Sequence, residues 1–168
     1  MKLMKLFTVS LALVGITGLA NADLRSEITT MNTKICQMMM KGDMKSLDAM
    51  MKAGMTSNFQ YVEGGKTMTY AQMFEQMKAS MSMMKCTSAT SKLASLKQNG
   101  KTATSVEKHM MAGTMTGPDK KPHKMSFSGT STNTYVLSGK MWKMSKMSWG
   151  ESKMMMDGKP MDPSKMGG

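Results

Sequence analysis

The interior of this domain has to be built largely from methionine. The chain of 168 residues contains 28 Met, and after residue 22 only ten Leu, Ile and Val accompany 26 of them. Methionine is unbranched and polarizable, so it fills irregular cores, and its thioether is also a soft ligand for Cu(I). The sequence therefore predicts a core in which Met takes positions usually held by Leu and Ile, and it raises the question of whether some thioethers bind something.

The N-terminal segment has the features of a secretory signal peptide over residues 1–22. Lys2 and Lys5 precede an apolar stretch over 6–19, and Ala20-Asn21-Ala22 fits the small-x-small pattern that precedes a cleavage site. The apolar stretch is short and interrupted by glycine, so we expect no transmembrane segment after signal removal. The sequence predicts an exported protein, periplasmic or extracellular, that begins near Asp23.

The charge balance is strongly basic, with a formal net charge of +12. Arg25 is the only arginine after the signal region and indeed in the chain, so the surplus is carried by lysine. Sites that read nucleic acids favour the planar arginine fork, and we therefore expect no nucleic-acid partner. The remaining interpretations are a solvated surface that aids solubility, or attraction to an anionic lipid or polymer.

Two cysteines, Cys36 and Cys86, allow one disulfide in an exported chain. The alternative is a pair of separate buried thiols, because a free cysteine behaves as a small apolar residue. The sequence has no CxxC motif and no Cys/His cluster, so it carries no zinc signature.

Helical spacing dominates the first half of the mature chain. Apolar residues recur every three or four positions over 24–40 and again over 44–51, with Gly42 and Asp43 suited to end one helix and begin the next. A strand over 58–62 follows, then a turn at Gly64-Gly65 and a third helix that opens with the capping box Thr69-x-x-Gln72.

The second half of the chain is predicted to form an antiparallel meander. Asn99-Gly100 is a strong hairpin signal. The four expected strands cover residues 88–98, 101–115, 123–137 and 140–149. The expected fold is α+β, with three N-terminal helices packed on one face of a curved, mainly antiparallel sheet. We expect the domain to cover 23–150 and residues 151–168 to form an irregular tail rich in Met, Lys, Gly and Pro.

The order of these elements resembles the nuclear transport factor 2-like superfamily, in its SnoaL-like branch. The resemblance rests on Lys41-Gly42-Asp43, on Gly64-Gly65-Lys66-Thr67, and on the late segments 99–104 and 139–144, and it covers about residues 24–150. It implies a sheet wrapped around helices as a cone with a central pocket, and homodimers that form through the sheet. Members include isomerases, dehydratases, hydrolases and non-catalytic binding domains, so the resemblance implies no single reaction.

Glu107 and His109 are the candidate catalytic residues. They lie two positions apart in a predicted strand, so both side chains point to one face. If this face lines the cone, His109 could transfer a proton while Glu107 orients it. The alternative is that both belong to the solvated part of the strand.

Tyr61, Asn133 and Tyr135 are the candidate hydrogen-bonding residues of the pocket, and Ser131 shares a strand face with the last two. A ketosteroid-type isomerase also needs a neutral Asp beside a Tyr. No Asp lies in the predicted late strands, which argues against that particular arrangement.

Most methionines lie at helical core spacing and need no role beyond packing. In a regular strand, Met144 would point away from Met141 and Met147, so these three could not converge on one ion. Only the group after the last predicted strand lies outside any core period, namely Met154, Met155, Met156 and Met161. This group is the candidate copper(I) or silver(I) site.

Together these patterns predict an exported domain that binds a small apolar molecule or serves as an accessory module, with no assigned reaction and no expected cofactor. One alternative is a small proton-transfer enzyme of the isomerase or dehydratase kind that uses Glu107 and His109. The other is a methionine-based copper(I) or silver(I) binder.

Overall fold

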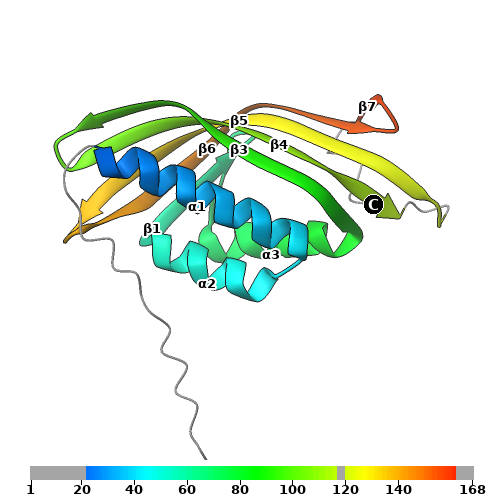
Figure 1. Cartoon of the computed structure of the whole chain (residues 1–168), viewed down its shortest axis with the longest axis horizontal. Helices are drawn as coiled ribbons and strands as arrows, with labels where there is room; N and C mark the ends of the chain where they lie inside the picture. The colour runs from blue at the N-terminus through cyan, green and yellow to red at the C-terminus, as the bar shows by residue number, and fades with distance from the viewer. Residues whose placement is uncertain (1–21, 117–119, 162–168) are drawn as a thin grey trace, which may run out of the picture.

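Three helices lie inside the arch of a single curved sheet (Figure 1). The computed structural model describes residues 22–116 and 120–161. The helices are α1 (Ala22–Lys41), α2 (Met44–Gly54) and α3 (Tyr70–Met83). This arrangement confirms the α+β fold with three N-terminal helices on one face of the sheet. The predicted signal peptide, apart from Ala22, lies outside the described residues.

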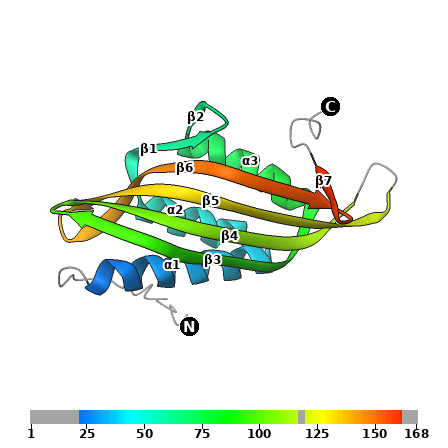
Figure 2. The ribbon, with the colours of Figure 1, turned by 90° about the horizontal axis from the view of Figure 1, so that it is seen from above.

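The sheet has seven strands within the described residues. They are β1 (Met55–Glu63), β2 (Lys66–Thr69), β3 (Met84–Asn99), β4 (Thr102–Thr116), β5 (Pro122–Ser138), β6 (Met141–Met156) and β7 (Lys159–Met161). Their order is β2-β1-β6-β5-β4-β3, with β7 added to β6, and all pairs are antiparallel except β1 with β6. Figure 2 shows the long strands β3 to β6 side by side.

Local capping sets the boundaries of the helices. Gly42 has a φ of +68°, which ends α1, and Asp43 Oδ1 accepts a hydrogen bond from the Ser46 N–H at 3.1 Å to begin α2. At α3, the Thr69 hydroxyl accepts from the backbone N–H of Gln72, and the Gln72 side chain accepts from the Thr69 N–H. The expected capping box is therefore present.

The expected irregular tail is wrong for residues 151–161. Strand β6 continues to Met156, and β7 returns beside it with Met154 opposite Met161. The turn between them is Asp157-Gly158, with φ angles of 49° and 78°, and two consecutive positive φ angles characterise a type I′ hairpin turn. Residues 162–168 lie outside the described part of the chain.

Three of the ten branched aliphatic residues after residue 22 occupy the deepest positions of the core, and the other seven are partly buried. Leu24, Ile28 and Leu47 are 0–1% exposed, whereas Met51 and Met73 of the same cluster remain 7–8% exposed. Further methionines pack around this centre, so Met does act as the core filler that its spacing predicts. Within residues 22–116 and 120–161, no helix is long and apolar enough to cross a membrane.

Candidate functional site

A cavity of about 370 Å³ lies between the helices and the inner face of the sheet. Twelve of the residues that line it are methionines, contributed by all three helices and by β1, β4 and β6. Aromatic rings from Tyr61, Phe127 and Trp149 complete much of the apolar wall. Thioether side chains adapt to the shape of what they contact, so this wall suits an apolar molecule without demanding one fixed outline.

Glu107 lies at the polar end of this cavity and accepts four hydrogen bonds. The residue is 1% exposed, and its Oε2 accepts from Asn32 Nδ2 of α1 at 2.7 Å. Its Oε1 accepts from Ser105 Oγ at 2.6 Å, from Asn133 Nδ2 at 2.8 Å and from Tyr135 OH at 3.0 Å. Because every partner is a donor, the carboxyl group acts as an acceptor through both oxygens, and it ties α1 to the sheet.

The predicted pocket residues therefore divide into two groups. Asn133 and Tyr135 both donate to Glu107, and neither lines the cavity. Burial and the neighbouring Glu107 carboxylate raise the pKa of the Tyr135 phenol well above its ordinary value of 10, so this hydroxyl stays a donor. Tyr61 does line the cavity, but its hydroxyl donates to Glu63 Oε2 at 2.9 Å.

His109 lies on the same inner face as Glu107, and both residues line the cavity. Its Nε2 lies 2.8 Å from Ser131 Oγ, and its ring centroid lies 4.8 Å from that of Trp149. The expectation that Glu107 orients His109 is wrong, because the hydrogen bonds of Glu107 go to other residues while Ser131 contacts the imidazole. Burial lowers the pKa of His109 below its usual 6.5, with a smaller opposing effect from Glu107, so the ring is neutral at pH 7.

A glycine makes the contact between His109 and Trp149 possible. Gly129 pairs with His109 across β4 and β5, and it leaves open the space that the Trp149 ring fills. A Cβ atom at Gly129 would lie 2.9 Å from Trp149 Cζ3 and 3.0 Å from Phe127 Cζ, closer than ordinary van der Waals contact. The missing side chain therefore shapes the polar end of the cavity, and sequence patterns gave no sign of this role.

Two polar atoms near His109 are buried without a hydrogen-bond partner in the described part of the chain. They are Ser91 Oγ and Trp149 Nε1, and both residues line the cavity. Ser91 lies directly opposite His109 in the pairing of β3 with β4. Because buried polar groups are nearly always paired in folded proteins, these atoms mark a place where a bound molecule can accept or donate hydrogen bonds.

The structure holds Cys36 and Cys86 as free buried thiols, the second of the two alternatives, and not as a disulfide. The thiol of Cys86 instead points to the carbonyl oxygen of Ser88, at 3.5 Å. Burial raises the pKa of both thiols, and the nearby Cys86 raises that of Cys36 further. Cys36 lines the cavity, where a protonated thiol acts as a small apolar group.

The methionines of β6 are arranged differently from the sequence-based expectation. A bulge at Ser145 shifts the register between Thr134 and Tyr135, and as a result Met144 and Met147 share the inner face and both line the cavity. Met154 lines it too. In 22–116 and 120–161, no group of three or more His, Cys, Asp or Glu residues is placed to hold a metal ion. Copper(I) binding by Met154, Met155, Met156 and Met161 stays a prediction.

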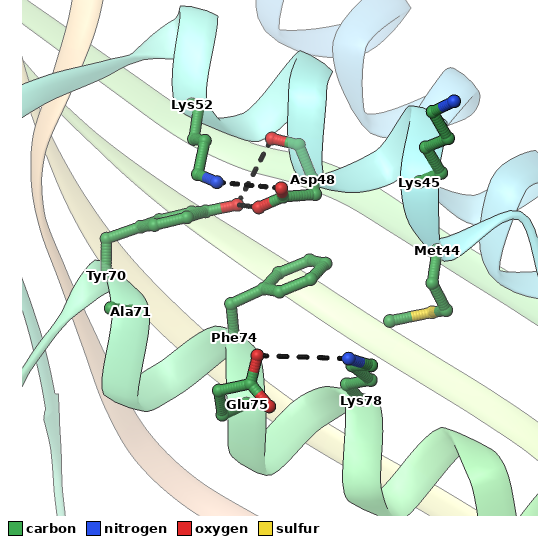
Figure 3. Close-up of a pocket in the computed structure, with 9 residues that line it drawn as sticks. All are labelled: Met44, Lys45, Asp48, Lys52, Tyr70, Ala71, Phe74, Glu75 and Lys78. Atoms are coloured by element: carbon green, nitrogen blue, oxygen red, sulfur yellow. Dashed lines mark hydrogen bonds and ion pairs between the residues drawn. The ribbon is translucent and has the colours of Figure 1, made fainter.

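A second hollow, of about 340 Å³, lies between α2 and α3 on the side away from the sheet (Figure 3). Tyr70 OH donates to Asp48 Oδ1 at 2.7 Å, and Lys52 Nζ contacts Asp48 Oδ2 at 2.8 Å. The Tyr70 ring stacks on Phe74 with centroids 5.7 Å apart. These groups satisfy one another and join the two helices, so we assign this hollow a structural role.

Comparison with solved structures confirms the fold. The chain is similar to a conserved protein from Planctomyces limnophilus (TM-score 0.59, 9% identity, 76% of this chain and 93% of that one). It is also similar to a nuclear transport factor 2-like superfamily protein from Salmonella enterica (TM-score 0.57, 12% identity, 88% and 98%). A third similar structure is a protein from Novosphingobium aromaticivorans provisionally described as a scytalone dehydratase (TM-score 0.55, 9% identity, 80% and 90%).

The fold is thus of the nuclear transport factor 2-like type, as the order of sequence motifs predicts. Identities of 9–12% show a shared fold and nothing about a shared reaction. No protein-family model matches the sequence, and no curated protein matches it either.

Proposed function

We propose that this chain is an exported domain that binds a small, mainly apolar molecule in the methionine-lined cavity. The observation that carries the proposal is the contrast within the cavity wall. An adaptable apolar surface meets one polar end, where Ser91 Oγ and Trp149 Nε1 lack partners. This combination of an apolar body and a few convergent polar atoms is typical of small-molecule sites.

Filling the cavity should weaken binding. Ala89 lines the cavity from β3, so Ala89→Phe is expected to weaken binding of the neutral fluorescent probe N-phenyl-1-naphthylamine by at least about tenfold. Fluorescence titration of the full chain measures this change. The matched control is Ala94→Phe on the same strand, where the side chain is exposed and binding should be unchanged. Equal affinity of both variants and the original chain would contradict the proposal.

A second candidate function is proton transfer by His109. The geometry of this residue favours it, because a neutral imidazole fixed by Ser131 lies in the cavity wall. A neutral imidazole can accept a proton from a carbon acid held next to it. Glu107, 1% exposed and bonded to four donors, then provides a fixed negative charge that stabilises the imidazolium as it forms.

Deuterium exchange tests this second function. In D₂O, the chain is expected to speed exchange at the carbon next to the carbonyl of α-tetralone, and His109→Gln should slow it by about a hundredfold. The rate should be level near pH 7 and fall only below pH 6.5, because the lowered pKa keeps His109 neutral above that pH. His123→Gln, which removes an imidazole bonded to Asp157 far along the sheet, is the control. Exchange equal in both variants would exclude His109 as the base.

A further inference from the structure

The outer face of the sheet carries a concentration of lysine. On each long strand the residues next to the inward-facing side chains point outward; Lys108, for example, lies between Glu107 and His109. Among the lysines that the pairing of β3 to β6 places on this outward side, six define what we call the basic face: Lys92, Lys97, Lys108, Lys143, Lys146 and Lys153. Between them lie mostly Ser and Thr, as in the row Lys97, Thr104, Thr134 and Lys146.

Little negative charge compensates this face. Strands β3 to β6 contain two acidic residues, of which Glu107 is buried on the inner side and Glu151 is exposed on β6. Within the described ranges, no ion pair involves any lysine of the basic face. Lys92 and Lys108 are direct partners across β3 and β4. Like charges at directly opposite positions destabilise a sheet. The stability of the fold therefore does not explain why these two lysines lie opposite each other.

No element of the described chain covers the basic face. Figure 1 shows the three helices on the opposite side of the sheet, and Figure 2 looks onto strands β3 to β6 with the helices behind them. An uncovered basic surface fits a partner that is itself anionic.

We propose that the basic face binds the surface of an anionic phospholipid bilayer. The lysines form a two-dimensional array across four strands, which matches a two-dimensional array of phosphates. A linear polyanion would need a groove to contact several rows, and the two hollows described above lie elsewhere. A second copy of the chain is disfavoured, because a symmetric contact would place lysines against lysines. Lysine, a compact point charge, suits such a contact without the arginine fork that base recognition favours.

Vesicle sedimentation of the full chain tests the proposal. We expect binding to vesicles of phosphatidylcholine mixed equally with phosphatidylglycerol at low salt, and loss of that binding in about 0.5 M salt. Vesicles of phosphatidylcholine alone report any insertion that does not depend on lipid charge. The variant Lys92→Gln/Lys108→Gln/Lys146→Gln should lower the partition constant by about a hundredfold, because each lysine near an anionic surface contributes a factor of about five.

The matched control removes three exposed lysines from the helices, in Lys34→Gln/Lys41→Gln/Lys45→Gln. This control has the same net charge as the triple variant of the basic face. It should nevertheless bind the vesicles almost as well as the original chain. Equal loss in both triple variants, or binding that does not require phosphatidylglycerol, would overturn the proposal. So would binding of soluble dextran sulfate by a chain that does not sediment with anionic vesicles. Thermal unfolding separates binding from folding, because removing Lys108 beside Lys92 should leave the melting temperature unchanged or higher.

Discussion

Glu107→Gln is expected to destabilise the domain by about 3–5 kcal/mol, because it removes a buried charge from four donors. The Gln side chain brings an NH₂ group to a place where Asn32, Ser105, Asn133 and Tyr135 all donate. At least one donor must then face another donor, and each buried polar group left unpaired costs about 1–3 kcal/mol. Urea unfolding followed by circular dichroism measures the change in the free energy of unfolding.

The control for this experiment is Glu151→Gln, which removes the same charge from an exposed position on β6. Its free energy of unfolding should stay within about 0.5 kcal/mol of the original value. If Glu107→Gln were equally mild, the hydrogen bonds around this carboxyl group would not hold the domain together. The expectation matters for function as well, because Asn32 links α1 to the sheet beside the cavity.

The alternation of side chains along strands was the most informative sequence signal for the site. It correctly predicts that Glu107 and His109 share one face of β4, and that Ser131, Asn133 and Tyr135 share one face of β5. The structure adds that both faces point inward. A period of two residues is a property of any extended chain, so it can be read without knowing the partners of the strand. The hairpin turn at Asn99-Gly100 is confirmed for a similar reason, with Asn99 paired to Thr102.

The partners of each polar group could not be read from the sequence. Asn32 and Glu107 are 75 residues apart in the chain, and no local pattern relates them. The sequence also could not show that Glu107 does not orient His109. Only the packing of α1 and the neighbouring strands shows that the hydrogen bonds of Glu107 join it to residues other than His109. Ser131, which contacts the imidazole, carried no signal beyond its shared face with Asn133 and Tyr135.

Irregularities of the strands account for the remaining errors. The bulge at Ser145 reverses the alternation of side chains between Met144 and Met147. A bulge interrupts the two-residue period of a strand, so that period cannot be used to predict where the bulge lies. The last hairpin did carry a signal, since Asp157-Gly158 is a turn dipeptide of the same kind as Asn99-Gly100. The surrounding Gly, Pro and Lys residues favour an irregular tail instead, so the sequence places Met154 outside any core period, although the residue lines the cavity.

Gly113→Ala is expected to cost about 3 kcal/mol, because the added Cβ meets backbone rather than a flexible side chain. It would lie 2.4 Å from the Lys85 carbonyl oxygen and 3.2 Å from Cys86 Cα, at the point where β3 and β4 shift register. Strand β3 must move to relieve this contact, and β3 carries Ala89 and Ser91 of the cavity wall. Both the affinity for N-phenyl-1-naphthylamine and the free energy of unfolding should therefore decrease.

Gly150→Ala is the matched control, since it too adds one methyl group to a strand glycine. Its Cβ would lie 3.5 Å from the Thr130 carbonyl oxygen, an ordinary contact, so stability should change by less than about 0.5 kcal/mol. Equal unfolding midpoints for the two variants would show that β3 adjusts at Gly113 without strain. A destabilised Gly113→Ala variant that keeps its affinity for the probe would instead separate the register of β3 and β4 from the shape of the cavity.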